Sequence, residues 1–241
     1  MFKDLFKLTQ DQNRRYARMN IIRLIHTESR FEGVNTTLTQ TQTIIDGLEV
    51  DGVPIEDINV IVQLKRGWNL IINSDEPIDL KFAQKINKIV AAHESLAPGE
   101  FRTGTGTVNT LNGEFIPQPV NLPEENSFLS RLFTGKASNT SKSLTLMYHL
   151  MRNQIFWDGN KRTATLLANK FMIDHGAGLI NVPLDKWSTW NQLISDYYQS
   201  GQIIRIKKWT YQNSIQGSTF DMQPNNQKIT NYSKKRKKFE R

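Results

Sequence analysis

The sequence predicts a mostly α-helical protein with one β-hairpin. Apolar residues recur at the three- and four-residue spacing of a helix along most of the 241 residues, and this pattern stops only between Gly99 and Pro119. In that interval small and β-branched residues alternate through 103–110, and the hairpin dipeptide Asn112-Gly113 follows. The chain contains no repeat of fixed period.

The helices expected before the hairpin are bounded by residues that start or stop helices. An apolar stripe that includes Tyr16, Met19 and Ile22 defines the first, and Gly33 ends it. Pro54 starts the third, because proline is tolerated in the first helical turn. The four predicted helices are 11–31, 39–46, 54–72 and 80–94.

Helical periodicity resumes after the hairpin. Glycine and asparagine separate these segments at plausible cap positions. The five predicted helices are 124–133, 141–153, 161–175, 184–199 and 203–214. The expected organisation is an N-terminal helical region at 1–98, a core at 99–215 and a tail at 216–241.

The net charge of +8 is concentrated in that tail. From Met222 onward there are seven basic residues and one acidic residue, so the first 221 residues hold 24 basic against 22 acidic side chains. Such a block is typical of a solvated, disordered tail, with weak binding to RNA or anionic surfaces as the alternative. We expect no other contact with nucleic acid.

Composition excludes several kinds of protein. The chain has no cysteine, which excludes disulfides, thiolate catalysis and Cys-ligated zinc. It has no apolar run long enough for a membrane span and no signal-peptide layout at its start. We therefore expect a cytoplasmic protein without a membrane partner.

One polar turn between two predicted helices, residues 154–164, has the residues of an anion site. Asp158, Gly159 and Asn160 can direct successive N–H groups to one side, and the next helix opens with Lys161 and Arg162. A phosphate would fit there, with the carboxylate of Asp158 as a Mg²⁺ ligand. The alternative is that Asp158 and Asn160 only cap the helix.

This segment resembles the signature of the Fic/Doc (Fido) family, His-x-Phe-x-Asp/Glu-Gly-Asn-Gly/Lys-Arg, at every fixed position except the first, which is Gln154. The hairpin introduced by 99–102 is similar to the family's target-binding flap. Residues 29–33 resemble the inhibitory Ser/Thr-x-x-x-Glu-Gly/Asn motif of members that carry their own regulatory helix, with Ser29 and Glu32 as its regulatory residues. The resemblance covers roughly 10–215 and implies a Fido-type helical bundle.

The resemblance also implies a function. Most members bind ATP with Mg²⁺ and transfer AMP to a hydroxyl side chain of a target protein. Asp158 would hold the metal, while Gly159, Asn160, Lys161 and Arg162 would hold the phosphates. The flap strand 103–110 would align an extended segment of the target protein. A homo-oligomer is compatible with the sequence.

Four positions depart from the family pattern. Gln154 replaces the His that takes the proton from the attacking hydroxyl, and a neutral amide cannot act as a base. Lys161 resembles the Doc branch, whose toxins phosphorylate their targets. Thr165 stands where many members carry a second Arg that pairs with the inhibitory Glu, so Glu32 would have to pair with Arg162 or Lys161. Glu28 stands where the inhibitory Ser/Thr is expected, and Glu32 could instead be a surface residue at a helix end.

The four histidines offer no evident replacement for Gln154. His149 lies on the same predicted helix but roughly 140° around it, and the others lie on other elements. Two hypotheses stay open: a weakened Fic-type nucleotidyl- or phosphotransferase, or a noncatalytic module that kept the nucleotide pocket as a regulatory device.

Overall fold

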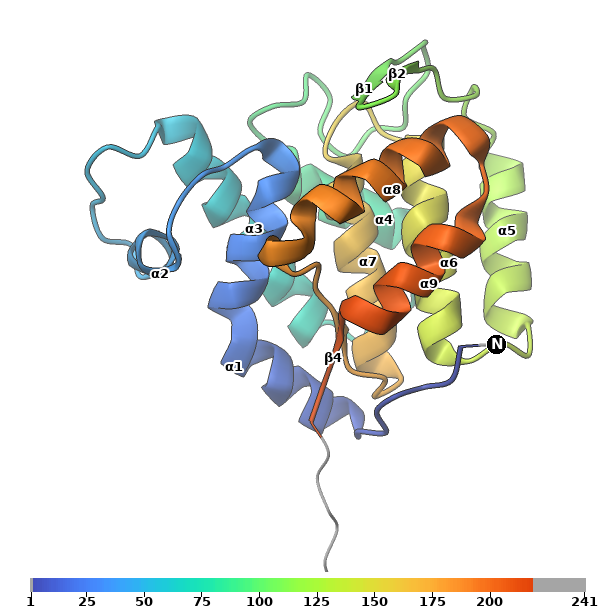
Figure 1. Ribbon diagram of the computed structural model, residues 1–241, viewed down its shortest axis with the longest axis horizontal. Coiled ribbons are helices and arrows are strands. Elements are labelled where there is room, and N and C mark those ends of the chain that lie inside the picture. The colour runs from blue at the N-terminus through green and yellow to red at the C-terminus, as the bar shows by residue number, and fades with distance from the viewer. Residues whose placement is uncertain (1, 219–241) are drawn as a thin grey trace, which may run out of the picture.

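The computed structural model describes residues 2–218, and the basic tail from residue 219 lies outside them. Within the described residues the fold is mostly helical with a small antiparallel hairpin, as the sequence predicts (Figure 1). The longer helices are α1 Gln10–Glu28, α2 Leu38–Ile45, α3 Ile55–Asn73, α4 Leu80–Val90, α5 Leu122–Thr134, α6 Asn139–Asn153, α7 Asn160–Asp174, α8 Trp187–Ser200 and α9 Ile203–Asn213. Each predicted helix is present, with ends that shift by a few residues.

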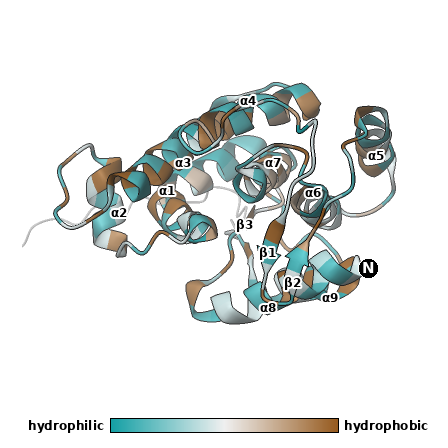
Figure 2. Cartoon of the chain, turned by 90° about the horizontal axis from the view of Figure 1, so that it is seen from above, coloured by the Kyte–Doolittle hydropathy of each residue, from teal (hydrophilic) through white to brown (hydrophobic). Residues whose placement is uncertain are grey.

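Helix α7 is the centre of the fold. It packs against α1, α3, α4 and α6, and all its residues from Arg162 to Ile173 are buried. Figure 2 shows it enclosed by these neighbours. Buried side chains from both sides of the expected boundary at residue 98 form one continuous core. The division into an N-terminal region at 1–98 and a core at 99–215 stays a prediction.

Two features differ from the sequence-based expectation. The first predicted helix is α-helical only to Glu28 and continues as a 3₁₀ turn, η1 Ser29–Glu32, which Gly33 ends with a φ of 77°. In the hairpin, β1 Val108–Thr110 pairs with β2 Gly113–Phe115, whereas 103–107 is not part of a strand. Gly104 and Gly106 explain the shorter strand, because glycine costs conformational entropy when it is extended.

The tip of the hairpin is docked on α8. The backbone N–H of Leu111 donates to Ser195 Oγ (3.1 Å), and the side-chain amide of Asn112 donates to Asp196 Oδ1 (2.9 Å). A second short antiparallel pair joins β3 Leu179–Ile180, which follows α7, to β4 Ile215–Gln216, which follows α9, and it was not foreseen from sequence. η2 spans Leu184–Lys186. None of the helices in the described residues is long and apolar enough to cross a bilayer.

Candidate functional site

The loop between α6 and α7 is held in shape by Asn160. Its Oδ1 accepts the N–H of Phe156 (2.9 Å), and its Nδ2 donates to the carbonyl of the same residue (2.8 Å). Both polar atoms of this side chain are therefore used inside the loop. Any anion at this place would meet the backbone N–H groups of the loop, while the Asn160 amide, expected to face the phosphate, supports the backbone instead.

Helix α7 starts without a side-chain cap. Its N-cap is Gly159, with φ at 67°, and a Cβ on that residue would lie 2.9 Å from Ala91 Cβ, so both conformation and space require glycine. Among the described residues, the N–H groups of Asn160, Lys161 and Arg162 have no hydrogen-bond acceptor. Neither Asp158 nor Asn160 caps this helix with its side chain, so the alternative interpretation of the two residues as helix caps is wrong. A helix start without a side-chain cap suits an anion.

Asp158 keeps a half-exposed carboxylate beside this helix start. Its Oδ1 accepts the N–H of Gly159 at 2.5 Å, and its side chain is 46% exposed. Asn87 of α4 fixes its backbone by donating to the Asp158 carbonyl (2.8 Å). The described residues contain no cluster of three or more His, Asp or Glu that could hold a metal alone. The half-exposed carboxylate of Asp158 is the kind of single protein ligand that Mg²⁺ takes when phosphate oxygens and water complete its shell.

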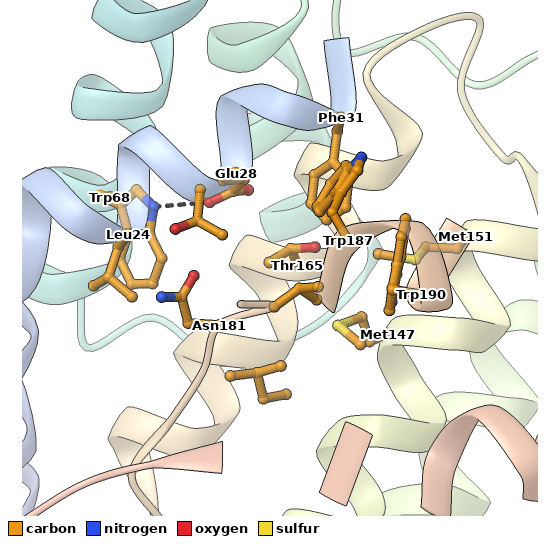
Figure 3. Close-up of a pocket in the computed structure, with 13 residues that line it drawn as sticks. Leu24, Glu28, Phe31, Trp68, Met147, Met151, Thr165, Asn181, Trp187 and Trp190 are labelled. Atoms are coloured by element: carbon orange, nitrogen blue, oxygen red, sulfur yellow. Dashed lines mark hydrogen bonds between the residues drawn. The ribbon is translucent and has the colours of Figure 1, made fainter. Parts of the chain in front are cut away.

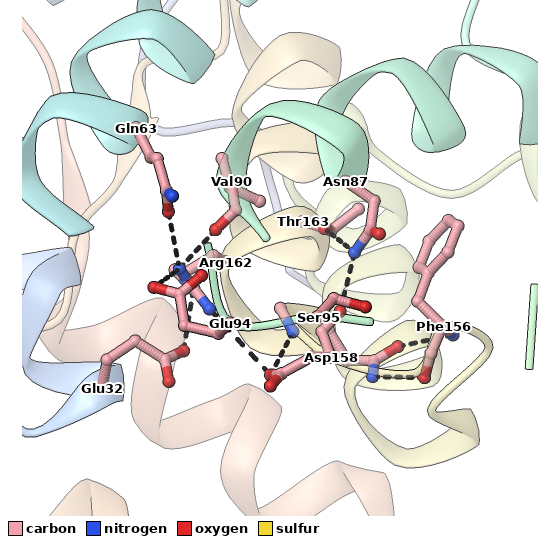
Figure 4. Close-up of polar contacts among 12 residues, drawn as sticks. Glu32, Gln63, Asn87, Val90, Glu94, Ser95, Phe156, Asp158, Arg162 and Thr163 are labelled. Atoms are coloured by element: carbon pink, nitrogen blue, oxygen red, sulfur yellow. Dashed lines mark hydrogen bonds and ion pairs between the residues drawn. The ribbon is translucent and has the colours of Figure 1, made fainter. Parts of the chain in front are cut away.

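Arg162 is completely buried and lies among three carboxylates (Figure 4). Its Nε is 2.8 Å from Glu32 Oε1, its Nη1 is 3.4 Å from Glu94 Oε1 and its Nη2 is 4.0 Å from Asp158 Oδ1. Nη1 also donates to the carbonyl of Val90. The N–H groups on Nε and Nη2 make no aligned hydrogen bond, so the contact with Glu32 is an ion pair that leaves donors available.

The turn η1 brings Glu32 to this site from the end of α1. Its Phe31 packs against Trp187 and Trp190 of the α8 region, with ring centroids 5.3 and 5.1 Å apart. Ser29, the other expected regulatory residue, is buried and donates back to the carbonyl of His26 (3.0 Å). Of the two, only Glu32 contacts the motif residues.

A small cavity lies behind η1 and contains two unsatisfied polar atoms (Figure 3). Glu28 is 3% exposed; its Oε2 accepts from Trp68 Nε1 (2.8 Å), and its Oε1 has no partner among the described residues. Thr165 Oγ1, from α7, lines the same cavity and is also unpaired. The volume open to water is about 10 Å³, about the size that one water molecule needs.

Burial raises the pKa of Glu28 to about 8, although the Trp68 hydrogen bond and Arg162 act in the opposite direction. This carboxyl group is therefore largely protonated at neutral pH. At the mouth of the site, burial lowers the pKa of Lys161, and the carboxylates of Glu32 and Asp158 partly offset that shift. The ammonium of Lys161 is thus influenced by two of the three carboxylates that surround Arg162.

Gln154 ends α6 and does not meet a base. Its Nε2 donates to the carbonyl of Met151 (2.5 Å) and approaches the hydroxyl of Tyr198 (3.4 Å). Burial raises the pKa of Tyr198, so this phenol does not supply a proton acceptor at neutral pH. His149 is bound to Glu125 (2.7 Å) and stacked on Phe128, which gives it a structural environment.

Sequence reasoning missed two polar residues of the site, Asn87 and Glu94. Asn87 is completely buried and donates to both the Asp158 carbonyl and Thr163 Oγ1 (3.1 Å), while its own Oδ1 accepts from Gly99. A polar residue on the apolar face of the predicted helix 80–94 was the available signal. Glu94 was expected to end the helix 80–94, whereas α4 ends at Val90 and Glu94 lies in the turn that follows, from which it reaches Arg162.

Comparisons with known proteins show which proteins the chain resembles. Residues 77–172 match the model of the Fic/DOC family. The protein adenylyltransferase Fic of Culex quinquefasciatus is 30% identical over 160 residues, which cover 60% of this chain and 30% of that protein. The chain thus spans about a third of the length of this curated relative.

Solved structures share the fold. A fragment of Fic-1 from C. elegans has a TM-score of 0.70 at 17% identity, covering 81% of this chain and 60% of that one. A Fic domain containing signaling protein from Bacteroides thetaiotaomicron has a TM-score of 0.63 at 19% identity, covering 88% and 94%. At these identities the likeness concerns the fold alone.

Proposed function

The chain contains a Fic/DOC domain, matched over residues 77–172, and on this premise we propose that it binds Mg²⁺-ATP at the loop between α6 and α7. AMP transfer to a hydroxyl side chain of another protein would be its ancestral chemistry, in line with the name of the Culex quinquefasciatus relative. The observation that carries this proposal is Arg162, a fully buried guanidinium whose Nε and Nη2 groups make no hydrogen bond, beside an uncapped helix start.

The residues of the loop have distinct roles in this proposal. Backbone N–H groups of Asn160 and Lys161 would bind one phosphate group, and Arg162 would bind another and offset charge in the transition state. Asp158 would hold Mg²⁺, which neutralises charge on the phosphate oxygens when bound. Asn87 and the Asn160 side chain would keep the loop in the binding shape through their bonds to its backbone.

The proton-transfer step is the weak point of the chemistry. AMP transfer requires the target hydroxyl oxygen to bond the α-phosphorus, the bond to pyrophosphate to break and the hydroxyl proton to leave. The amide of Gln154 cannot accept that proton. Since a general base contributes roughly 10² to 10⁴ in rate, we propose that nucleotide binding is retained while transfer is slow.

Glu32 would restrain the same site. Its carboxylate contacts the guanidinium that a phosphate would need, so nucleotide and Glu32 would compete for Arg162. The ion pair between Glu32 and Arg162 supports the proposal that 29–33 is an inhibitory segment. It would act together with the loss of the base to keep basal transfer low.

A noncatalytic nucleotide-binding module is the second candidate, and the position of Gln154 favours it. The Gln154 amide bonds the end of its own helix rather than pointing free toward an acceptor. A Doc-like phosphotransferase is the third, because Lys161 adds a cation at the phosphate site. Transfer assays with differently labelled ATP separate the three.

The test combines calorimetry with transfer assays on wild type and Gln154→His. We expect heat of Mg²⁺-ATP binding in both proteins, and Arg162→Ala should weaken binding by about 1.5 to 3 kcal/mol. Protein labelled from α-labelled ATP indicates AMP transfer, whereas labelling only from γ-labelled ATP indicates phosphate transfer. If ATP, ADP and GTP give no heat at millimolar concentration, the pocket hypothesis is wrong.

A further inference from the structure

Arg102, at the base of the hairpin, is a buried cation that binds only carbonyl groups. Its side chain is nearly inaccessible, at 4% exposure for the residue. Nε donates to the carbonyl of Gln154 (2.9 Å), Nη2 donates to that of Gln118 (2.7 Å), and Nη1 donates to that of Gly104. Among residues 2–218 it forms no ion pair. Burying a charged guanidinium without an ionic partner costs folding free energy. Its presence here therefore indicates a structural or functional role.

The three carbonyls belong to three different segments. Gly104 lies on the arm that enters the hairpin, Gln118 on the arm that leaves it, and Gln154 at the end of α6 where the motif loop begins. One planar guanidinium therefore ties both arms of the hairpin to the first motif position. A single ammonium on a flexible stem lacks the forked donor geometry for this arrangement.

The same junction is reinforced by the backbone. Arg102 N–H donates to the carbonyl of Ile155 (2.8 Å), and Phe101 forms a β-bridge with Phe156. The two phenyl rings stack with centroids 5.3 Å apart. These contacts set the position of the hairpin base next to the motif loop.

Gln154 needs such support because of its backbone conformation. Its φ of 49° and ψ of 55° lie in the left-handed region, and it is the one non-glycine residue with a positive φ in the part of the chain that the structure describes. A side-chain-bearing residue stays in that region only when its surroundings hold it there. The Arg102 Nε bond to the Gln154 carbonyl is a direct contact of that kind.

We propose that Arg102 is a positioning residue that fixes the hairpin relative to position 154. A protein segment lying along 103–107 would then present its hydroxyl group at a set place relative to the side chain at 154. This inference rests on the proposed function for its meaning, but the placement itself can be measured without nucleotide or target.

The test is hydrogen exchange on full-length wild type, Arg102→Lys and Arg102→Gln. The matched control is Arg14→Lys, because Arg14 also bonds a backbone carbonyl, that of Ser74 (3.0 Å), at a place away from the hairpin. In both Arg102 variants we expect exchange of the bonded amides at 102, 108–115 and 156 to speed up about tenfold, the size of one lost charged hydrogen bond. Exchange in α3 should stay unchanged, and Arg14→Lys should leave the hairpin protected.

Chemical rescue supplies a readout that a general packing role would not give. Guanidinium ion at about 20 mM, far below the molar concentrations that unfold proteins, should restore part of the lost protection in Arg102→Ala but not in Arg14→Ala. Wild-type protection at the hairpin in Arg102→Lys, or a uniform loss across all helices without rescue, would overturn the proposal. Failure of ATP binding by calorimetry would overturn the proposed function and leave this exchange result intact.

Discussion

Glu32 and Arg162 form the ion pair that joins η1 to the candidate site. Replacing Glu32 with Gln removes the negative charge 2.8 Å from Arg162 Nε while keeping the size of the side chain. We expect Mg²⁺-ATP to bind about tenfold more tightly to Glu32→Gln, because a coupling between two ligands for one group is commonly worth about 1 to 3 kcal/mol. Calorimetry measures this change.

The control for that prediction is Glu56→Gln, which alters net charge equally at an exposed position in the first turn of α3. It should leave ATP affinity unchanged. Equal affinity of wild type and Glu32→Gln would mean that Glu32 does not compete with nucleotide.

Position 154 decides whether a base is present. Gln154→His introduces a group with an unperturbed pKa near 6.5, which can accept a proton at neutral pH. We expect at least about tenfold more label transferred from α-labelled ATP to protein, the low end of general-base effects because Lys161 and Thr165 also depart from the expected family pattern. Glu32→Gly should increase this transfer further.

The contrary result for Gln154 is equally clear. If wild type labels protein as fast as Gln154→His, another group takes the proton, and the assignment of Gln154 as the disabling change has to be abandoned.

Glu28 should make stability depend on pH. Its pKa is about 8 in the folded protein, above the value of 4.5 for an exposed carboxyl, so the folded state binds this proton more tightly. The stabilisation is complete below pH 4.5 and is lost as pH rises to about 8, with a slope of at most about 1.4 kcal/mol per pH unit. Denaturant unfolding of wild type and Glu28→Gln between pH 5 and 9 measures it, and the variant should lose this slope.

At the scale of an element, α1 and η1 act as a single docked segment. Phe31 anchors η1 on Trp187 and Trp190, and Glu28 anchors the end of α1 on Trp68. These contacts lie on either side of the turn from which Glu32 reaches Arg162, so we expect them to hold Glu32 in place. The position of η1 should therefore affect the proposed nucleotide site through Glu32, the residue of η1 that contacts Arg162.

We expect Phe31→Ala to lower stability by about 2 kcal/mol, the scale of a partly buried aromatic side chain, and to raise ATP affinity by loosening Glu32. Phe133→Ala is the matched control, since Phe133 is also half-buried and stacks on Phe171 (5.1 Å) away from η1. Denaturant unfolding measures the change in stability of both variants, and calorimetry measures their affinity for ATP. Similar ATP affinities in the two variants would contradict a role for η1 docking.

At the scale of the whole molecule, the described core closes before the basic tail begins. The β3–β4 pair ends at Gln216, upstream of the block from Met222 to Arg241. Deleting that block should change the melting temperature by less than about 2 °C and leave ATP affinity intact, because it has little apolar surface to bury. A large fall in melting temperature would show that the tail docks on the core.

The deletion also tests the remaining charge-based expectation. Weak binding of RNA to the full chain should disappear in the truncated protein and in high salt, since phosphate contacts release counterions. Persistent RNA binding by the truncated protein would indicate a basic surface within the first 221 residues, which contain 24 basic and 22 acidic side chains.

The sequence by itself determined the helices, the hairpin turn and the motif loop. Helical periodicity and caps are local, so α3 and α4 could be located within a few residues, and Asn112-Gly113 marked the turn. The unusual loop between α6 and α7 was also evident from residues adjacent in the chain, including Gly159 with its required positive φ.

Only the tertiary structure decided which distant groups meet. Arg162 receives Glu32 from η1 and Glu94 from beyond α4, and sequence reasoning had left the partner of Glu32 open between Arg162 and Lys161. The carbonyl contacts of Arg102 and the β3–β4 pairing were likewise not visible in any local pattern. Periodicity records which face of an element is buried, whereas ion pairs and strand pairing depend on how the buried faces close against one another in space.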